Sequence, residues 1–358
     1  MSEFRHCPVS IARIPAGLSA PSRSVGEFLA AASGYILPSM QRAVSTLPEE
    51  IRNLAGIHFG WWDAAGDFTD GPAGKAVRPA LTLAVCQAMG GAGADALPAA
   101  VAVELVHNAS LIHDDLIDRD ATRHGRPTIW HQFGLPAAVL TGDALFFLAI
   151  DTLRRGSPAL AGLGVTRLTL AVQALIGGEY HDTLLEGQIL PILDDVISMT
   201  EAKTSVLIAE ACALGAIAAD ACPERVAHLY AFGLHLGSAF QLVDDLLGIW
   251  GESATTGKPI WSDLRSRKKS LPVAAALTSD HPAASTLRRL YSQHGAFTEN
   301  QLVEVAALID EAGGRRWAAT TAEDHIGKAM THLQDASAAP GPAAELSALA
   351  RHIAHRDH

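Results

Sequence analysis

The sequence predicts a single all-α domain. Apolar residues return every three or four positions from Val25 onward, as in the segment from Val101 to His107, which is the spacing of one helix face. Runs of alternating β-branched residues, the usual signature of strands, are nearly absent. Turn-forming pairs also fall at helix-sized intervals, so we expect a bundle of helices.

Breaks between the predicted helices fall at residues 63–74, 90–93, 125–136, 219–223, 251–259 and 338–342. None is long enough for an interdomain linker, so residues 25–358 should form one domain. Residues 1–24 lack helical periodicity and are predicted to be a poorly ordered tail, with a docking peptide as the alternative. The glycines at 90–93 and at 177–178 are interpreted as turns between helices, because no strand precedes them and no GKS or GKT follows.

Composition excludes several classes of protein. The 358 residues are 49% hydrophobic and carry 27 Lys plus Arg against 38 Asp plus Glu, a formal charge of −11, so general binding of nucleic acid is not expected. The N-terminal segment lacks the continuous apolar core and cleavage site of a secretory signal, so export is not expected. The most apolar run, from Leu135 to Ile150, is interrupted by Gly142 and Asp143. We therefore expect a soluble cytoplasmic protein without a transmembrane segment. The cysteines form no CxxC pair and are interpreted as thiols in a reducing compartment: Cys7, Cys86, Cys212 and Cys222.

Two carboxylate clusters follow apolar helical segments. Asp114 and Asp118 are one helical turn apart and Asp115 flanks them, so the three would repel one another unless solvated or neutralised. Mg²⁺ prefers oxygen ligands and is the natural partner, although a solvated helix end is the alternative. Asp244 and Asp245 repeat the arrangement. Two such helices facing each other could hold several Mg²⁺ ions and neutralise the charge on a diphosphate leaving group.

Basic residues flank both clusters. Several cations beside metal-type carboxylates in an acidic chain are better explained as phosphate ligands than as surface charges. The candidates are Lys75, Arg78, Arg123, Arg126, Lys203, Lys258, Lys268 and Lys269.

In chain order these segments read GKxxRP, HDDxxD with a following Arg, KT, FQxxDD and GKPxxSDLRxxKKSLP. This order resembles the trans-prenyltransferases, the polyprenyl diphosphate synthase family, over the chain from about Val25 onward. The sequences of residues 58–63 and 244–251 are most similar to those of actinobacterial geranylgeranyl diphosphate synthases. The resemblance implies a helical bundle around a deep central cavity and a homodimer. It also implies head-to-tail condensation of isopentenyl diphosphate with an allylic diphosphate, releasing pyrophosphate and most simply yielding geranylgeranyl diphosphate or a longer product.

The resemblance also implies roles for single residues. Mg²⁺, three ions per active site, would be held by Asp114, Asp115, Asp118, Asp244 and Asp245. The diphosphate of isopentenyl diphosphate would be held by Lys75, Arg78 and His107, with His124 in place of a usual second Arg. The allylic diphosphate would be held by Arg123, Lys203 and Lys258, with Thr204 and Gln241 lining that site. The catalytic set is then Asp114, Asp115, Asp118, Arg123, Lys203, Asp244 and Lys258. His107 lies two turns before Asp114 on nearly the same face, which is a separate argument for its place in the site; without the motif, a satisfied core histidine is the alternative.

Chain length is approached by geometry. Ser110 lies one turn before Asp114, and both Ala109 and Ser110 are small, so a product longer than C15 is favoured. The alternative is that they only allow close packing of helices. Phe146, Phe147 or residues of a partner subunit are candidates for a deeper floor of the cavity.

Departures from the family pattern leave other functions open. Gly248 replaces the last Asp of the second cluster, Trp261 stands where a small Gly is common, and the segment 188–203 is short. These departures suggest a class I terpene cyclase as the nearest alternative. A prenyl-diphosphate-binding subunit without turnover and a His-Asp metal phosphohydrolase are the remaining hypotheses.

Overall fold

The computed structural model describes residues 23–69, 74–188, 190–251, 260–293 and 295–354. The all-α prediction is confirmed. The helices are, in order, α1 (Val25–Val44), α2 (Glu49–Phe59), α3 (Val77–Ala88), α4 (Gly93–Ile117), α5 (Ile129–Phe133), α6 (Leu135–Arg154), α7 (Val165–Glu186), α8 (Leu193–Thr200), α9 (Val206–Ala218), α10 (Pro223–Trp250), α12 (Ser262–Arg265), α13 (Leu271–Thr278), α14 (Pro282–Ser292), α15 (Glu299–Glu311), α16 (Gly314–Asp335) and α17 (Pro340–Ala354). Two π-helical turns, η1 (Leu160–Gly164) and η2 (Glu201–Ser205), continue into α7 and α9.

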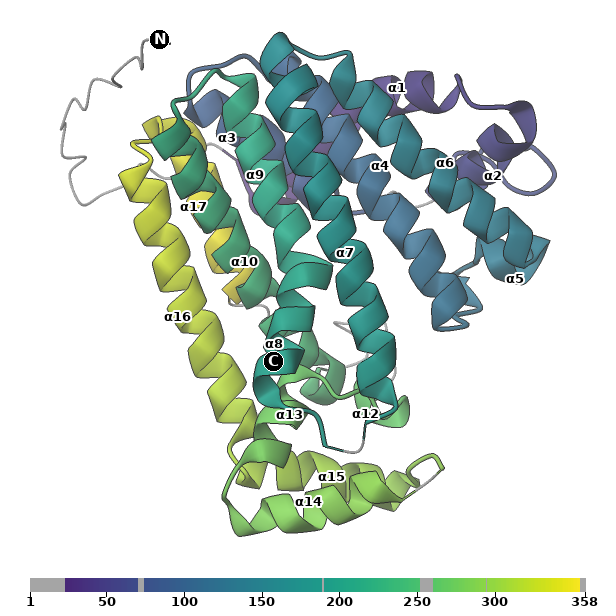
Figure 1. Ribbon diagram of the computed structural model, residues 1–358, viewed down its shortest axis with the longest axis vertical. Coiled ribbons are helices and arrows are strands. Elements are labelled where there is room, and N and C mark those ends of the chain that lie inside the picture. Colours follow the sequence, from purple (N-terminus) through teal and green to yellow (C-terminus); the bar gives the residue numbers. More distant parts are fainter. Residues whose placement is uncertain (1–22, 70–73, 189, 252–259, 294, 355–358) are drawn as a thin grey trace.

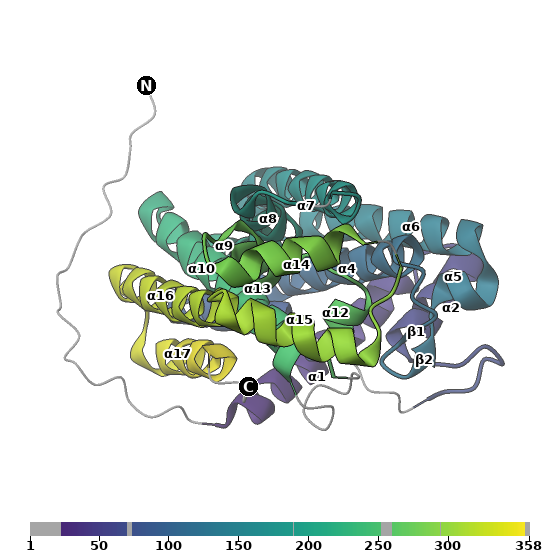
Figure 2. The ribbon, with the colours of Figure 1, turned by 90° about the horizontal axis from the view of Figure 1, so that it is seen from below.

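The long helices run along one axis of the molecule, and α14 and α15 lie across one end (Figure 1). Figure 2 shows that end directly. α9 is at the centre, because every residue from Leu207 to Ala218 is buried. Small residues let its neighbours approach closely: a Cβ on Gly215 would lie 2.3 Å from the carbonyl oxygen of Thr82 in α3.

α1 begins where the sequence predicts it. The Ser24 hydroxyl accepts a hydrogen bond from the Glu27 amide, and the Glu27 carboxylate accepts one from the Ser24 amide, which is a capping box. The preceding Arg23 reaches α17, where its guanidinium donates to both carboxylate oxygens of Glu345 at 2.8 and 3.2 Å. The poorly ordered tail was predicted for residues 1–24; of these, Arg23 and Ser24 have defined contacts, while residues 1–22, with Cys7, lie outside the described residues.

Two of the predicted breaks are wrong in detail. Gly177 and Gly178 lie inside α7 rather than in a turn, because a Cβ on Gly178 would lie 2.6 Å from the backbone nitrogen of Lys203 and only glycine permits that approach. The break at 125–136 contains the helix α5, and beside it β1 (Thr122–Arg123) pairs with β2 (Arg126–Pro127) in an antiparallel hairpin.

Four helical segments are long and apolar enough to cross a membrane by length and composition alone: α4, α6, η1 with α7, and α10. Gly142 and Asp143, which interrupt the apolar run from Leu135 to Ile150, lie within α6, and the helix still meets the length and composition of a membrane span. The most apolar windows of α4 and α10 are 61% and 56% buried in the bundle, whereas those of α6 and η1–α7 are only 33% and 28% buried. The last two helices thus present a large apolar surface. Its exposed side chains include Leu140, Phe147, Leu163, Leu170, Ile176 and Tyr180.

Candidate active site

The first carboxylate cluster lies at the C-terminal end of α4. Asp115 is 2% exposed and points inward, whereas Asp118 ends the helix in an exposed position. Burial raises the pKa of Asp115 to about 6 although the Arg123 guanidinium favours its charged form. Burial, with help from the Asp114 charge, raises the pKa of Asp118 to about 6. Burial therefore disfavours the charged forms of both carboxylates, which a bound cation would favour.

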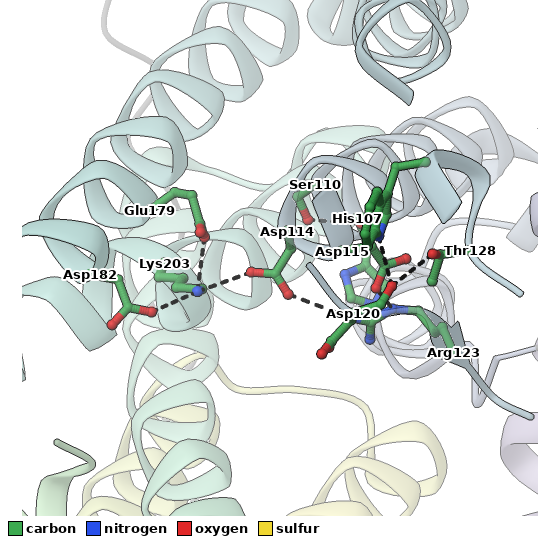
Figure 3. Close-up of polar contacts among 11 residues, drawn as sticks. His107, Ser110, Asp114, Asp115, Asp120, Arg123, Thr128, Glu179, Asp182 and Lys203 are labelled. Carbon is green, nitrogen blue, oxygen red and sulfur yellow. Dashed lines mark hydrogen bonds and ion pairs between the residues drawn. The ribbon is translucent and has the colours of Figure 1, made fainter. Parts of the chain in front are cut away.

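Lys203, from η2, contacts three carboxylates (Figure 3). Its Nζ is 3.0 Å from Asp114, 2.9 Å from Glu179 and 2.7 Å from Asp182. Burial opposes the charge on Lys203, but these three carboxylates raise its pKa above the ordinary value. Although burial favours a neutral Asp114, Lys203 and Arg123 hold the pKa of Asp114 below its ordinary value.

Glu179 and Asp182 were missed by the sequence reasoning. They are three residues apart on α7, and the pair gives no signal until Lys203 is known to face it.

Arg123 approaches the same cluster from the other side. Its Nε donates to Asp115 Oδ1 at 2.5 Å, and an Nη nitrogen lies 3.5 Å from Asp114. The β1–β2 hairpin holds it there through a two-residue turn, in which His124 and Gly125 have φ of 52° and 74°. Positive φ at both positions is the requirement of a type I′ turn. Asp114 is thus flanked by cations on both sides, Lys203 and Arg123 (Figure 3).

The second cluster is linked to η2 by hydrogen bonds. Thr204 Oγ1 donates to Gln241 Oε1 at 3.1 Å, and Gln241 Nε2 donates to Asp245 Oδ1 at 2.8 Å. Asp245 Oδ2 also accepts from the amide of Leu271, and burial raises the pKa of Asp245 to about 7. Asp244, beside it, is exposed. Thr204, Gln241 and Asp245 line one pocket together with Lys203 and Lys268.

His107 lies among cations. Burial, followed by the Arg78 and Arg123 guanidinium groups, holds the pKa of His107 well below its ordinary value. Arg78 Nε is buried and has no hydrogen-bond partner, and His124, whose own pKa is lowered by burial and by Arg123, Arg126 and Lys75, lies near His107. Lys75 is exposed nearby in sequence. Such a cluster has the charge and the unused donor expected of an anion site.

The acidic residues fit Mg²⁺. Asp114 Oδ1 is buried and receives no well-aligned hydrogen bond, although the Lys203 ammonium is 3.0 Å away. The exposed Asp118 and Asp244 present further carboxylate oxygens, the ligand type that this ion prefers.

The departures near the second cluster have structural counterparts. A Cβ on Gly248 would lie 2.2 Å from Asp263 Oδ2, so the Asp263 carboxylate occupies the space beside Gly248. Trp261 has φ of 61°, the left-handed region in which glycine is favoured. Asp263 was also missed by the sequence reasoning. Lys258 lies outside the described residues, so its predicted role stays a prediction.

The chain-length residues lie on α4 beside this site. Ala109 is fully buried, and Ser110 is half-buried with its hydroxyl donating to the His107 carbonyl at 2.8 Å. Phe146 contacts the His113 ring, with 5.7 Å between ring centroids. Phe147 was a wrong candidate for a cavity floor within one subunit, because it is 78% exposed on the outer face of α6.

Comparison with known proteins identifies the family. Residues 61–309 match the Polyprenyl synthetase family. The chain is 42% identical over 321 residues to a geranylgeranyl diphosphate synthase of Mycobacterium tuberculosis, covering 89% of this chain and 91% of the relative. It is 40% identical over 331 residues to a (2E,6E)-farnesyl diphosphate synthase of Mycobacterium bovis, covering 92% of each chain.

Solved structures agree. A polyprenyl synthetase from Streptomyces coelicolor superposes with a TM-score of 0.88 at 40% identity, covering 92% of this chain and 99% of that one. A geranylgeranyl pyrophosphate synthase from Corynebacterium glutamicum, complexed with isoprenyl diphosphate and magnesium, superposes with a TM-score of 0.76 at 26% identity, covering 93% and 100%. The fold, the ordered motifs and these matches together show that the chain belongs to the polyprenyl synthetase family and is a prenyltransferase.

Proposed function

We propose that this protein condenses isopentenyl diphosphate with an allylic diphosphate, releases pyrophosphate and makes geranylgeranyl diphosphate or a longer product. The observation that carries the proposal is the position of Asp114 between two groups of cations. Lys203 lies on one side, and Arg123 with the cluster around His107 lies on the other. Two separate cation-rich sites beside one carboxylate cluster suit a reaction between two diphosphates.

We assign the site residues to the two substrates as follows. Arg78, His107, His124 and the exposed Lys75 bind the diphosphate of isopentenyl diphosphate. Lys203, with Thr204 and Gln241, binds and orients the allylic diphosphate in the pocket that these residues line. Arg123 keeps Asp115 in place and contributes to the field at the leaving group. Burial and the Arg78 and Arg123 guanidinium groups lower the pKa of His107, which favours its neutral form as a hydrogen-bond donor to the diphosphate.

Mg²⁺ would be held by Asp114, Asp115 and Asp118 of α4 and by Asp244 of α10. When bound, it neutralises the charge that develops on the diphosphate as the allylic C–O bond breaks. Asp245 is already committed to Gln241 and Leu271, and we propose that Asp263 provides the carboxylate that Gly248 lacks. We further propose that the protein is cytoplasmic and forms a homodimer through the apolar face of α6 and α7.

Product analysis tests the proposal. Isopentenyl diphosphate is supplied with each of the C5, C10, C15 and C20 allylic diphosphates, and products are identified by mass spectrometry while pyrophosphate is measured. We expect elongation to C20 or beyond. Absence of elongation with every primer contradicts the proposal, and conversion of geranylgeranyl diphosphate alone to a hydrocarbon indicates a cyclase instead.

Chain length is tested at Ser110. Ser110→Phe places a ring one turn from Asp114 on its face, where it would block a growing tail, so we expect shorter products with elongation of the C5 primer retained. Ser198→Phe on α8 is the matched control and should leave the product length unchanged. If Ser110→Phe makes the same product as the unaltered protein, residues other than Ser110 determine the chain length.

A further inference from the structure

Four histidines lie at the contact between α10 and α16. His228 and His235 are seven residues apart on α10, and His325 and His332 are seven apart on α16, so each pair shares a helix face. The two helices lie side by side (Figure 1). Nδ1 of His228 is 3.1 Å from Nδ1 of His332, and Nδ1 of His235 is 3.1 Å from Nδ1 of His325.

Two ring nitrogens at this distance cannot both carry a proton in neutral imidazoles that face each other, so at least one lone pair points into the gap. A tetrahedral Zn²⁺ with bonds of 2.0–2.1 Å would place two nitrogen ligands about 3.3 Å apart. A small adjustment of the rings therefore converts a hydrogen-bonded pair into two ligands of one metal ion.

Among the described residues, only the first of the two pairs has a carboxylate oxygen close enough to share a metal ion with it. Asp335 lies three residues after His332 on α16, and its oxygen and the ring nitrogens of His228 and His332 all lie within 4.8 Å of one another. The other pair lies near both a cation and a carboxylate: after burial and the neighbouring imidazoles, the Lys328 ammonium lowers the pKa of His235, and the Asp324 charge acts on His325 without joining a ligand group. A metal ion is favoured at the first pair and disfavoured at the second.

We propose that His228, His332 and Asp335 bind a late first-row transition metal, with Zn²⁺ as the expected ion, and that water completes its coordination. Two imidazoles and one carboxylate suit Zn²⁺, whereas Mg²⁺ prefers oxygen ligands, so the two kinds of ion would not compete for this site. His228 is 16 residues from Asp244 on the same helix, about 24 Å at 1.5 Å per residue. The metal would join α16 to the helix that carries the second carboxylate cluster.

The experiment uses the full chain without a histidine tag, freed of trace metals and kept in excess Mg²⁺. Zn²⁺ is titrated by calorimetry, and Co²⁺ is substituted to record the visible absorption of a tetrahedral site with nitrogen ligands. We expect one equivalent of Zn²⁺ per chain and a rise in Tm. His228→Asn and His332→Asn should each weaken binding at least about tenfold.

Further variants separate the proposal from simpler explanations. Asp335 is exposed, so Asp335→Asn tests the site without disturbing the helix interface, and it should weaken Zn²⁺ binding while leaving Tm without metal unchanged. His325→Asn removes the second pair and should leave Zn²⁺ affinity unchanged. The proposal is overturned if Zn²⁺ does not bind, or if Asp114→Asn abolishes binding while His228→Asn and Asp335→Asn do not.

Discussion

Lys203 shows how one side chain can serve both the folded state and the reaction. Without substrate its ammonium balances Asp114, Glu179 and Asp182, which otherwise repel one another across the gap between α4 and α7. We infer that the same ammonium contacts a diphosphate when substrate and Mg²⁺ enter. Loss of the Lys203 charge should therefore lower both the stability of the fold and the catalytic rate, and the two effects can be measured separately.

Lys203→Met keeps the length of the side chain and removes its charge. We expect kcat/KM to fall at least about 100-fold, the scale of losing one charged contact to a developing anion. Without Mg²⁺ the variant should be less stable by about 2 kcal/mol, because three carboxylates lose their partner. Added Mg²⁺ should raise its Tm more than that of the unaltered protein. Lys203→Arg, which keeps the charge, is the control, and equal Mg²⁺ effects on Lys203→Met and the unaltered protein would contradict the inference.

His58 makes stability depend on pH. Its Nε2 is 3.0 Å from Asn108 Oδ1, and burial lowers the pKa of His58 from 6.5 to about 4. The unfolded chain therefore binds this proton more readily, so the stabilisation is complete above pH 6.5 and is lost as the pH falls toward 4. Urea unfolding at pH 7 and pH 4.5 should show that His58→Gln loses about 2 kcal/mol less than the unaltered protein over this interval. If His58→Gln and the unaltered protein lose the same free energy of unfolding over this interval, groups other than His58 cause the acid sensitivity.

At the scale of elements, α7 and η2 show what the sequence could and could not predict. The Lys203-Thr204 motif was predictable because charged and hydroxyl residues stand out in an apolar helix. The role of Gly178 was not predictable, because the sequence around a glycine that ends a helix does not differ from the sequence around a glycine at a contact between two helices. Likewise Asp263 became relevant only when its carboxylate was found beside Gly248. Local periodicity predicted the helices, but contacts between distant elements decided which side chains meet.

Gly178→Ala tests the close approach of these two elements. The added Cβ would lie 2.6 Å from the Lys203 backbone nitrogen, so α7 and η2 must separate, and we expect a loss of about 2 kcal/mol in urea unfolding. Activity should also fall because Lys203 moves. Gly34→Ala is the matched control, since nothing lies within 4 Å of its Cβ in the middle of α1, and it should stabilise the protein by about 0.5–1 kcal/mol. A neutral Gly178→Ala would show that the elements adapt without cost.

At the scale of the whole molecule, the outer face of α6 and α7 carries many exposed apolar side chains. Exposed Leu140, Phe147 and Leu170 lie on helices whose most apolar windows are only about a third buried. Exposed apolar side chains on neighbouring helices are typical of interfaces, and we infer that a second copy of the chain covers them through the same residues on both sides.

The double variant Phe147→Asp with Leu170→Asp tests the homodimer. Light scattering after size-exclusion chromatography should give twice the mass of one chain for the unaltered protein and the mass of one chain for the variant. Val303→Asp places the same charge on the exposed face of α15, and it should leave the mass of the dimer unchanged. A variant that keeps the doubled mass would place the interface elsewhere.

The ion pair between Arg23 and Glu345 has a consequence for the order of folding. The two residues are 322 positions apart, so the pair gains nothing until almost the entire bundle has assembled and brought α17 to the start of α1. Contacts that form after the rate-limiting barrier change the rate of unfolding and leave the rate of folding almost unaltered. We therefore expect the Arg23–Glu345 pair to lengthen the lifetime of the folded molecule by slowing its unfolding, and to leave the folding rate almost unchanged.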